Sequence, residues 1–161
     1  MVFVTIGTSE PFDRLLRALP RLDGEELVVQ AGESELRPDD ARCISYVPYE
    51  ELVELIRAAR VVVTHAGVGT IMTALANGKR PVVMPRLARF GEAVDDHQVP
   101  LARRLAEAGF VTLAEDEATL ALALSGDAVA PTPSQNGHGK LVGELRDFLF
   151  ERLGASAASR S

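Results

Sequence analysis

The sequence contains little that would support several common classes of protein. Cys43 is the single cysteine, so one chain can form neither a disulfide nor a thiolate metal site. Basic residues number 17 against 23 acidic ones, and a net charge of −6 gives nucleic-acid binding no electrostatic support. No apolar run approaches the length of a membrane-spanning helix, and the short apolar start lacks the basic leader of a signal peptide. These absences predict a soluble protein in a reducing compartment.

What is present is the pattern of an α/β domain. The chain has 161 residues, of which 47% are hydrophobic, enough for one domain with a substantial core. Short β-branched runs alternate with segments of helical periodicity. The expected strands are 2–6, 27–30, 43–47, 60–64, 81–84 and 110–113, and the expected helices are 12–19, 49–59, 69–77, 96–108 and 118–124. This alternation predicts a doubly wound, Rossmann-like parallel sheet, which binds ligands at the carboxyl ends of its strands.

The chain is expected to form a single nucleotide-sugar-binding domain over residues 1–153. Within it, residues 125–139 are rich in Gly, Pro, Ser and Asn and predict a loop or linker. Residues 140–153 predict a C-terminal helix, and 154–161 a frayed tail. The helix carries an apolar stripe of Leu141, Leu145, Phe148 and Leu149. The stripe either packs on the chain's own sheet, which is the ordinary outcome, or binds a partner chain.

The first candidate site is the segment His65-Ala66-Gly67-Val68-Gly69-Thr70, which joins a strand to a helix. Two glycines there allow positive φ and close approach of backbone to a ligand. The following helix directs its unpaired N–H groups at that ligand, which suits a diphosphate. Thr70 adds a hydroxyl to this cradle, and His65 can donate a hydrogen bond to a phosphate oxygen and offset charge on a departing nucleoside diphosphate. The alternatives are a tight turn that requires glycine, a first-turn threonine and a structural histidine.

The second candidate site is Asp95-Asp96-His97-Gln98, at the start of the expected helix 96–108. Asp96 is predicted to cap that helix, and Gln98 has the donor and acceptor groups that read the hydroxyls of a sugar. An ordinary helix N-terminus is the alternative. A metal site built from these residues and His65 is disfavoured because their spacing is unconvincing, so no metal is expected.

Other strand ends supply further candidates. Gly7-Thr8-Ser9 forms a second glycine turn, and Glu10 and Asp13 nearby are candidate bases, or helix N-terminal acids. Arg86 and Arg89 follow the strand at 81–84, where they either contact phosphates or are solvated loop arginines.

These motifs together resemble the donor-binding half of GT-B glycosyltransferases, of the family 28 C-terminal type. The matching segments are 64–70, Gly78-Lys79-Arg80-Pro81, Pro85-Arg86, Gly91-Glu92, 95–98, and at the start Val4 to Thr8 with Pro11 to Leu15. The resemblance covers about residues 1–109. It is strongest to the small subunit of bacterial two-chain exopolysaccharide glycosyltransferases, and the chain is similar too to the catalytic subunit of the dolichol-linked N-acetylglucosaminyltransferase.

The resemblance implies a role for each matching residue. His65, Ala66, Gly67, Gly69 and Thr70 hold the diphosphate of a UDP-sugar, Val47 lies beside the uracil, and Asp96, His97 and Gln98 face the donor sugar, with His65 and Asp96 as the catalytic pair. Reaction inverts the anomeric carbon without a metal or cofactor. A membrane-anchored partner subunit supplies the acceptor, a polyprenyl-phosphate-linked sugar at the cytoplasmic face of the membrane.

The chain departs from this family pattern at Thr73, where a Glu usually holds the ribose hydroxyls. A threonine cannot accept two hydrogen bonds as a carboxylate does, and charge-assisted bonds contribute about 1.5–3 kcal/mol each. Weak UDP binding, substitution by Glu92, and loss of activity are the open alternatives. The chain would in the last case be a non-catalytic subunit that activates a partner transferase. An unrelated nucleotide-binding module is disfavoured because the third glycine of the dinucleotide fingerprint is absent.

Overall fold

A computed structural model describes residues 1–126 and 142–151 of the chain. Its elements are, in order, β1 (Val2–Thr5), α1 (Asp13–Arg17), β2 (Leu27–Gln30), β3 (Ala41–Ile44), α2 (Tyr49–Ala58), β4 (Val61–Thr64), α3 (Val68–Ala76), β5 (Val82–Val83), a 3₁₀ turn (Ala88–Phe90), α4 (Gln98–Glu107), β6 (Thr112–Leu113) and α5 (Glu117–Leu124). Residues 142–151 are also helical. The expected linker at 127–139 and tail at 154–161 lie outside the described residues.

The sheet has six parallel strands in the order β3-β2-β1-β4-β5-β6. This order confirms the doubly wound α/β fold, in which the chain starts at the centre and winds first to one edge and then to the other. β1 pairs in register with both neighbours, so that Val4 lies between Val29 and Val63. β1, β2 and β4 are buried on both faces, and most of their residues are valine, with one phenylalanine and one leucine.

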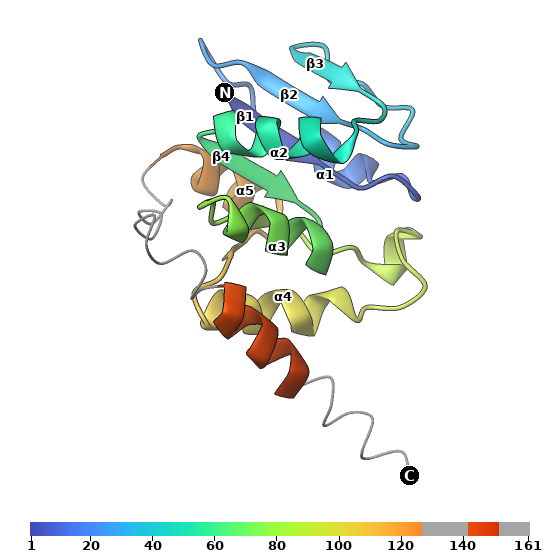
Figure 1. Cartoon of the computed structure of the whole chain (residues 1–161). Helices are drawn as coiled ribbons and strands as arrows, with labels where there is room; N and C mark the ends of the chain where they lie inside the picture. Colours follow the sequence, from blue (N-terminus) through green and yellow to red (C-terminus); the bar gives the residue numbers. More distant parts are fainter. Residues whose placement is uncertain (127–141, 152–161) are drawn as a thin grey trace.

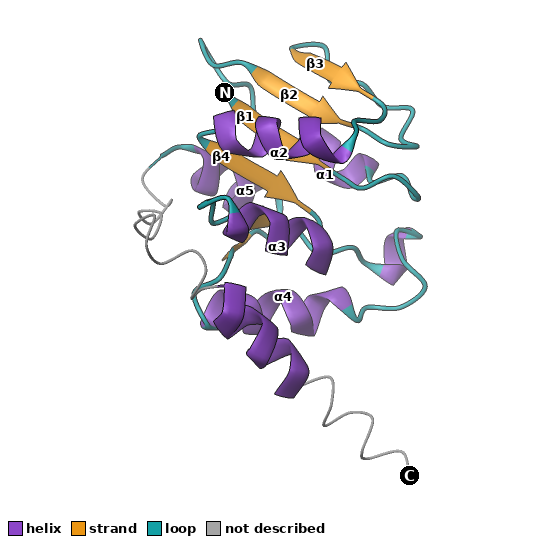
Figure 2. Cartoon of the chain, in the orientation of Figure 1, coloured by secondary structure: helices purple, strands orange, loops and turns teal. Residues whose placement is uncertain are grey.

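Helices cover both faces of the sheet (Figures 1 and 2). On one face, Leu15 of α1 and Leu120 of α5 pack against Val4 and Val63. On the other face, α2 and α3 pack on the side of the sheet that carries Phe3, Val28 and Val62. α4 extends this second layer over β5 and β6. Each face therefore has its own apolar layer, and the loops at the ends of the strands are left for function.

The helix at 142–151 packs on the chain's own sheet layer. Leu145 is fully buried and Leu149 nearly so, in one cluster with Leu105 and Val83. The ring of Phe148 lies 6.2 Å from that of Phe110. The described part of the stripe thus belongs to the core, which agrees with the first alternative, packing on the chain's own sheet. Leu141 lies outside the described residues.

Some expected boundaries are wrong. The third strand ends at Ile44 instead of Val47, because its pairing with β2 ends at the Gln30–Ile44 pair and the chain then turns toward α2. α4 starts at Gln98, and Asp96 does not cap it with its side chain. The Asp96 carboxylate accepts instead from the backbone N–H of Ala88, across the loop. Residues 110 and 111 precede β6, because the Phe110 amide closes the end of α4 on the Leu105 carbonyl.

Candidate active site at the carboxyl edge of the sheet

Three neighbouring strands bring the expected site residues to one edge. Gly7 follows β1, His65 follows β4, and Arg86 follows β5, and these strands are adjacent in the sheet. Since parallel strands end at the same edge, the three loops meet there. Figure 1 shows the loop between β5 and α4 on the same side of the molecule as the carboxyl end of β4.

His65 is packed between two glycines. A Cβ atom added at Gly67 would lie closer than 3.0 Å to the imidazole, and one added at Gly7 would lie 3.2 Å from Cε1. Only glycine at position 67 admits the ring in this orientation. The expectation that the loop's glycines adopt positive φ is wrong, because Gly67 has φ −80° and neither it nor Gly69 is among the residues with positive φ. Gly67 serves close packing instead.

The loop after β1 does require positive φ. Gly7 has φ +82°, and Gly32, after β2, has φ +47°. A Cβ atom at Gly32 would collide with the Gly7 carbonyl oxygen. The turns after β1, β2 and β4 therefore pack against one another through Gly7, Gly32 and Gly67.

This packing keeps the imidazole neutral. Burial, with a smaller contribution from the positive charge of Arg86, lowers the pKa of His65 to about 4. Nδ1 lies 3.4 Å from the Thr64 hydroxyl. A neutral imidazole carries one N–H, so at neutral pH His65 can donate a single hydrogen bond to a ligand. It offers that ligand no positive charge.

The N-terminus of α3 is open and free of acidic side chains. No side chain caps it, and its first turn contains no acid. Gly69 is the second residue of α3, and a Cβ atom there would meet nothing within 4 Å. The backbone N–H groups of this first turn have no intrahelical partner and carry a positive partial charge beside the exposed Gly69, which suits an anion.

Thr73 lies one turn further along α3. Its hydroxyl donates to the Gly69 carbonyl at 2.9 Å. The hydroxyl proton is therefore used within the helix. Toward a ligand, Thr73 can accept a hydrogen bond but has no proton left to donate.

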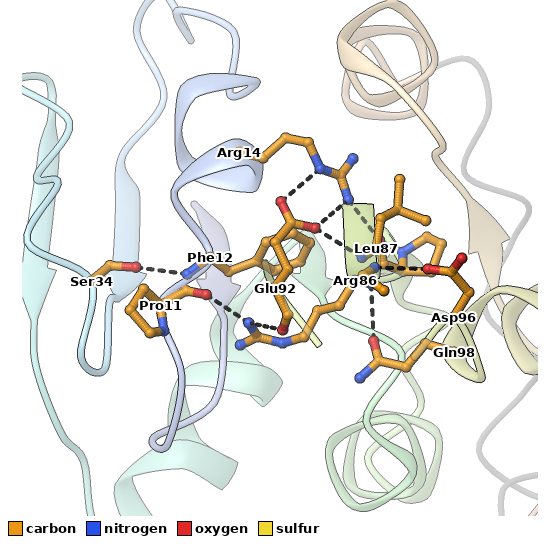
Figure 3. Close-up of polar contacts among 11 residues, drawn as sticks. Pro11, Phe12, Arg14, Ser34, Arg86, Leu87, Glu92, Asp96 and Gln98 are labelled. Carbon is orange, nitrogen blue, oxygen red and sulfur yellow. Dashed lines mark hydrogen bonds and ion pairs between the residues drawn. The ribbon is translucent and has the colours of Figure 1, made fainter. Parts of the chain in front are cut away.

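Arg86 points inward, away from solvent (Figure 3). Its terminal nitrogens donate to the carbonyls of Ile6 (2.8 Å), Glu10 (2.9 Å), Pro11 (2.7 Å) and Glu92 (3.3 Å). The loop position of Arg86 suggested either a phosphate ligand or a solvated side chain. The second description is wrong, since Arg86 is 4% exposed.

The residues of the second candidate site lie around the same loop. The Gln98 side-chain oxygen accepts from the Arg86 backbone N–H at 3.0 Å, and Asp96 accepts from Ala88. His97 is exposed and pairs with the carboxylate of Asp95. Hydrogen bonds from the His97 backbone and ring lower the pKa of Asp95. Gln98 and Asp96 thus each hold the loop after β5 with one oxygen.

Glu92 and Arg14 form a pair that sequence reasoning missed. The Arg14 guanidinium donates to both Glu92 oxygens at 2.8 and 2.9 Å, and Glu92 also accepts from the Leu87 N–H (Figure 3). Glu92 is 7% exposed and fully engaged. These contacts disfavour the alternative that Glu92 replaces Thr73 as a ribose ligand. The sequence gives one hint of this ion pair: Arg14 and Glu92, 78 residues apart, each lie in a segment that matches the family pattern.

The remaining expected residues are placed as follows. Thr8 is exposed, while Ala66 and Val47 are buried. Glu10 is exposed. Asp13 lines a cavity of about 710 Å³ between α1, the loop after β5 and the start of α5, which does not include His65 or the glycine loop. Burial raises the pKa of the Cys43 thiol, as expected of an unreactive cysteine.

Within residues 1–126 and 142–151, no group of three His, Cys, Asp or Glu side chains is placed to hold a metal ion. In the same part of the chain, no helix has the length and apolarity needed to cross a membrane.

The fold places this chain in the class of doubly wound α/β domains, and domains of solved glycosyltransferase structures share that fold. The glycosyltransferase SnogD from Streptomyces nogalater has a TM-score of 0.56 and 21% identity, with 90% of this chain and 39% of that chain covered. The kitacinnamycin glycosyltransferase has a TM-score of 0.57 and 20% identity, with 99% and 43% covered. At such identities the likeness shows the fold alone.

The chain belongs to the family described as the glycosyltransferase family 28 C-terminal domain, whose model matches residues 1–125. This match confirms the family resemblance. The UDP-N-acetylglucosamine transferase subunit ALG13 of Yarrowia lipolytica is 27% identical over 121 residues, which are 65% of this chain and 60% of the relative. The aclacinomycin-T 2-deoxy-L-fucose transferase of Streptomyces galilaeus is 32% identical over 108 residues, 58% of this chain and 24% of the relative. The chain thus corresponds to part of each.

Proposed function

We propose that this chain is the donor-binding, catalytic subunit of an inverting, metal-independent UDP-sugar glycosyltransferase. The observation that carries the proposal is the neutral His65, held between Gly7 and Gly67 beside the open N-terminus of α3. The family match and the name of the Yarrowia relative, a UDP-N-acetylglucosamine transferase subunit, support the donor class.

In this proposal the diphosphate lies at Gly67, Gly69 and Thr70. As the bond to the anomeric carbon breaks, negative charge grows on the departing UDP. The N–H groups and dipole of α3, with one hydrogen bond from His65, stabilise that charge without a cation. Gln98 and Asp96 face the donor sugar, and Val47 lies beside the uracil. An acceptor hydroxyl attacks the opposite side of the anomeric carbon and inverts it, while a base on the acceptor-binding partner takes the hydroxyl proton and UDP leaves.

The acceptor in this proposal comes from a partner. The matched relatives extend beyond the region shared with this chain, and the Yarrowia relative is named as a subunit. Loops at the carboxyl edge expose large apolar side chains, Tyr46 after β3 and Phe90 and Val94 after β5. We infer that a membrane-anchored, acceptor-binding subunit covers this edge and brings a polyprenyl-phosphate-linked sugar to the cytoplasmic membrane face.

The variant Gly69→Ala tests the position of the diphosphate. The added methyl meets no protein atom within 4 Å, and alanine is favoured over glycine in a helix by up to about 1 kcal/mol. We expect an unchanged or higher melting temperature, but at least tenfold weaker UDP binding in calorimetry, because the methyl occupies the space in front of the N–H groups.

Gly143→Ala is the matched control, since Gly143 lies in the helix at 142–151 and also has nothing within 4 Å. It should leave UDP affinity unchanged. Failure of the wild-type chain to bind UDP or UDP-sugars at millimolar concentration, with its partner present, would sink the proposal. Equal UDP affinity of Gly69→Ala and wild type would show that the diphosphate does not bind at the N-terminus of α3.

A non-catalytic, activating subunit is the second candidate. The observation that favours it is Thr73, whose hydroxyl proton is already used by the Gly69 carbonyl. Substituting His65 and Gln98 in the assembled complex separates the two functions. Transferase activity that survives both changes would show that another chain is catalytic.

A further inference from the structure

Arg86 is a buried charged side chain that joins the loops of the site from within. Three of its four backbone partners, the carbonyls of Ile6, Glu10 and Pro11, belong to the segment between β1 and α1. That segment contains Gly7, whose missing side chain makes room for His65. A single guanidinium with two terminal nitrogens therefore sets the path of the whole turn.

The same turn is held on its other side by Phe12. The Phe12 N–H donates to the buried Ser34 hydroxyl at 2.8 Å. The Arg86 guanidinium carbon lies 4.7 Å from the centre of the Phe12 ring, and that of Arg14 lies 5.3 Å from it. The two guanidinium–ring contacts partly replace the hydration that a buried cation loses.

Arg86 is itself fixed by Gln98, one of the residues expected to face the donor sugar, and by Glu92. Its backbone N–H donates to Gln98 at the start of α4, and its side chain also donates to the Glu92 carbonyl (Figure 3). Arg86 thus connects α4, the loop after β5 and the turn after β1. The bonds to the Ile6 and Glu92 carbonyls are buried, so no water can replace the arginine there, and a shift of one of these segments disturbs the others.

We propose that Arg86 is a positioning residue of the donor site, which acts by holding the Gly7 turn and His65 in register with Gln98, and not by contact with the phosphates. This inference rests on the proposed function. Both terminal nitrogens of Arg86 are already engaged by backbone carbonyls, and the side chain is closed to solvent. Arg86 therefore shapes the site without touching the donor.

Arg86→Met tests the inference, with Arg60→Met as a matched control. Methionine keeps most of the apolar contact with Phe12 but donates no hydrogen bond. Arg60 is also structural, since it binds Glu25 at 3.0 and 2.7 Å and the Leu124 carbonyl at 3.1 Å. It precedes β4, at the opposite edge of the sheet. Both variants should lower the melting temperature, and only Arg86→Met should affect the donor site.

We expect Arg86→Met to weaken UDP binding at least tenfold in calorimetry and Arg60→Met to change it less than twofold. Imidazole NMR should show the pKa of His65 moving up in Arg86→Met alone, since a nearby cation is lost. If Arg86→Met does not fold, Arg86→Lys keeps the charge with a single nitrogen and should bind UDP at least threefold more weakly than wild type.

The outcomes separate this inference from the proposed function. If the wild-type chain does not bind UDP, the proposed function fails, and the inference with it. If the wild type binds UDP and Arg86→Met binds equally well, with an unchanged His65 titration, only the inference is overturned.

Discussion

At the residue scale, His65 shows how burial sets the protonation state of a site. Its imidazole occupies space that side chains at positions 7 and 67 would fill. Its pKa of about 4 means that the ring is neutral throughout the physiological range. A residue so placed can donate one hydrogen bond at any pH that a cell presents, without changing charge.

Replacing His65 with Gln should make the protein more resistant to acid. The folded-state pKa of about 4 is below the ordinary 6.5, so the unfolded chain binds the extra proton between these values. Stability from the neutral ring is fully present above pH 6.5 and is lost as pH falls toward 4, by about 3 kcal/mol in total. Urea unfolding of both proteins at pH 7 and pH 4 measures this. An equal pH dependence in the two would contradict a depressed His65 pKa.

Thr73 offers a second prediction at this scale. The family pattern has Glu at this position, and a carboxylate accepts from both vicinal ribose hydroxyls. Thr73→Glu should therefore tighten UDP binding at least tenfold, given about 1.5–3 kcal/mol for each charge-assisted bond. Calorimetry with UDP and with its 2′-deoxy analogue measures the change. The gain should be smaller for the deoxy analogue; identical gains would place Thr73 away from the ribose.

At the element scale, local patterns were enough to predict the type and order of the elements but not their ends. The third strand stops at Ile44 because its neighbour β2 stops pairing there. α4 starts at Gln98 because Asp96 is engaged by the Ala88 N–H instead of capping the helix. Both outcomes depend on contacts with segments distant in the sequence, which periodicity does not report.

The helix at 142–151 carries the element-scale prediction. Leu145 is fully buried against the α4 layer, whereas Phe150 is 71% exposed. Leu145→Ala should lower the free energy of unfolding by about 2–5 kcal/mol, and Phe150→Ala by less than about 0.5 kcal/mol. Chemical denaturation measures both. A neutral Leu145→Ala would mean that the helix does not stabilise this domain.

At the scale of the whole molecule, the proposed function makes this chain the donor half of a site that a partner completes. The carboxyl edge carries the candidate donor residues, and the exposed Tyr46, Phe90 and Val94 lie on loops at that same edge. A half-site of this kind binds its own ligand but does not position a second substrate.

The isolated chain should therefore bind UDP yet transfer no sugar to a polyprenyl-phosphate-linked acceptor. Transfer should appear when the acceptor-binding partner is added, because only then do both substrates meet. A radiolabelled-sugar assay with and without the partner measures this, with His65→Gln in the complex as the control for catalysis by this chain. Transfer by the isolated chain would contradict the half-site description.

The sequence by itself determined the alternation of strands and helices, the doubly wound fold and the family, because these depend on local hydrophobic periodicity and on short ordered motifs. Only the tertiary structure decided that position 67 must be glycine, which groups the carboxylates of Asp96 and Glu92 bind, and that Arg86 is buried. Each of these depends on contacts between loops far apart in the chain, such as the hydrogen bond from Arg86 to the carbonyl of Ile6, 80 positions earlier. Such contacts arise only when the parallel strands bring their carboxyl ends to one edge.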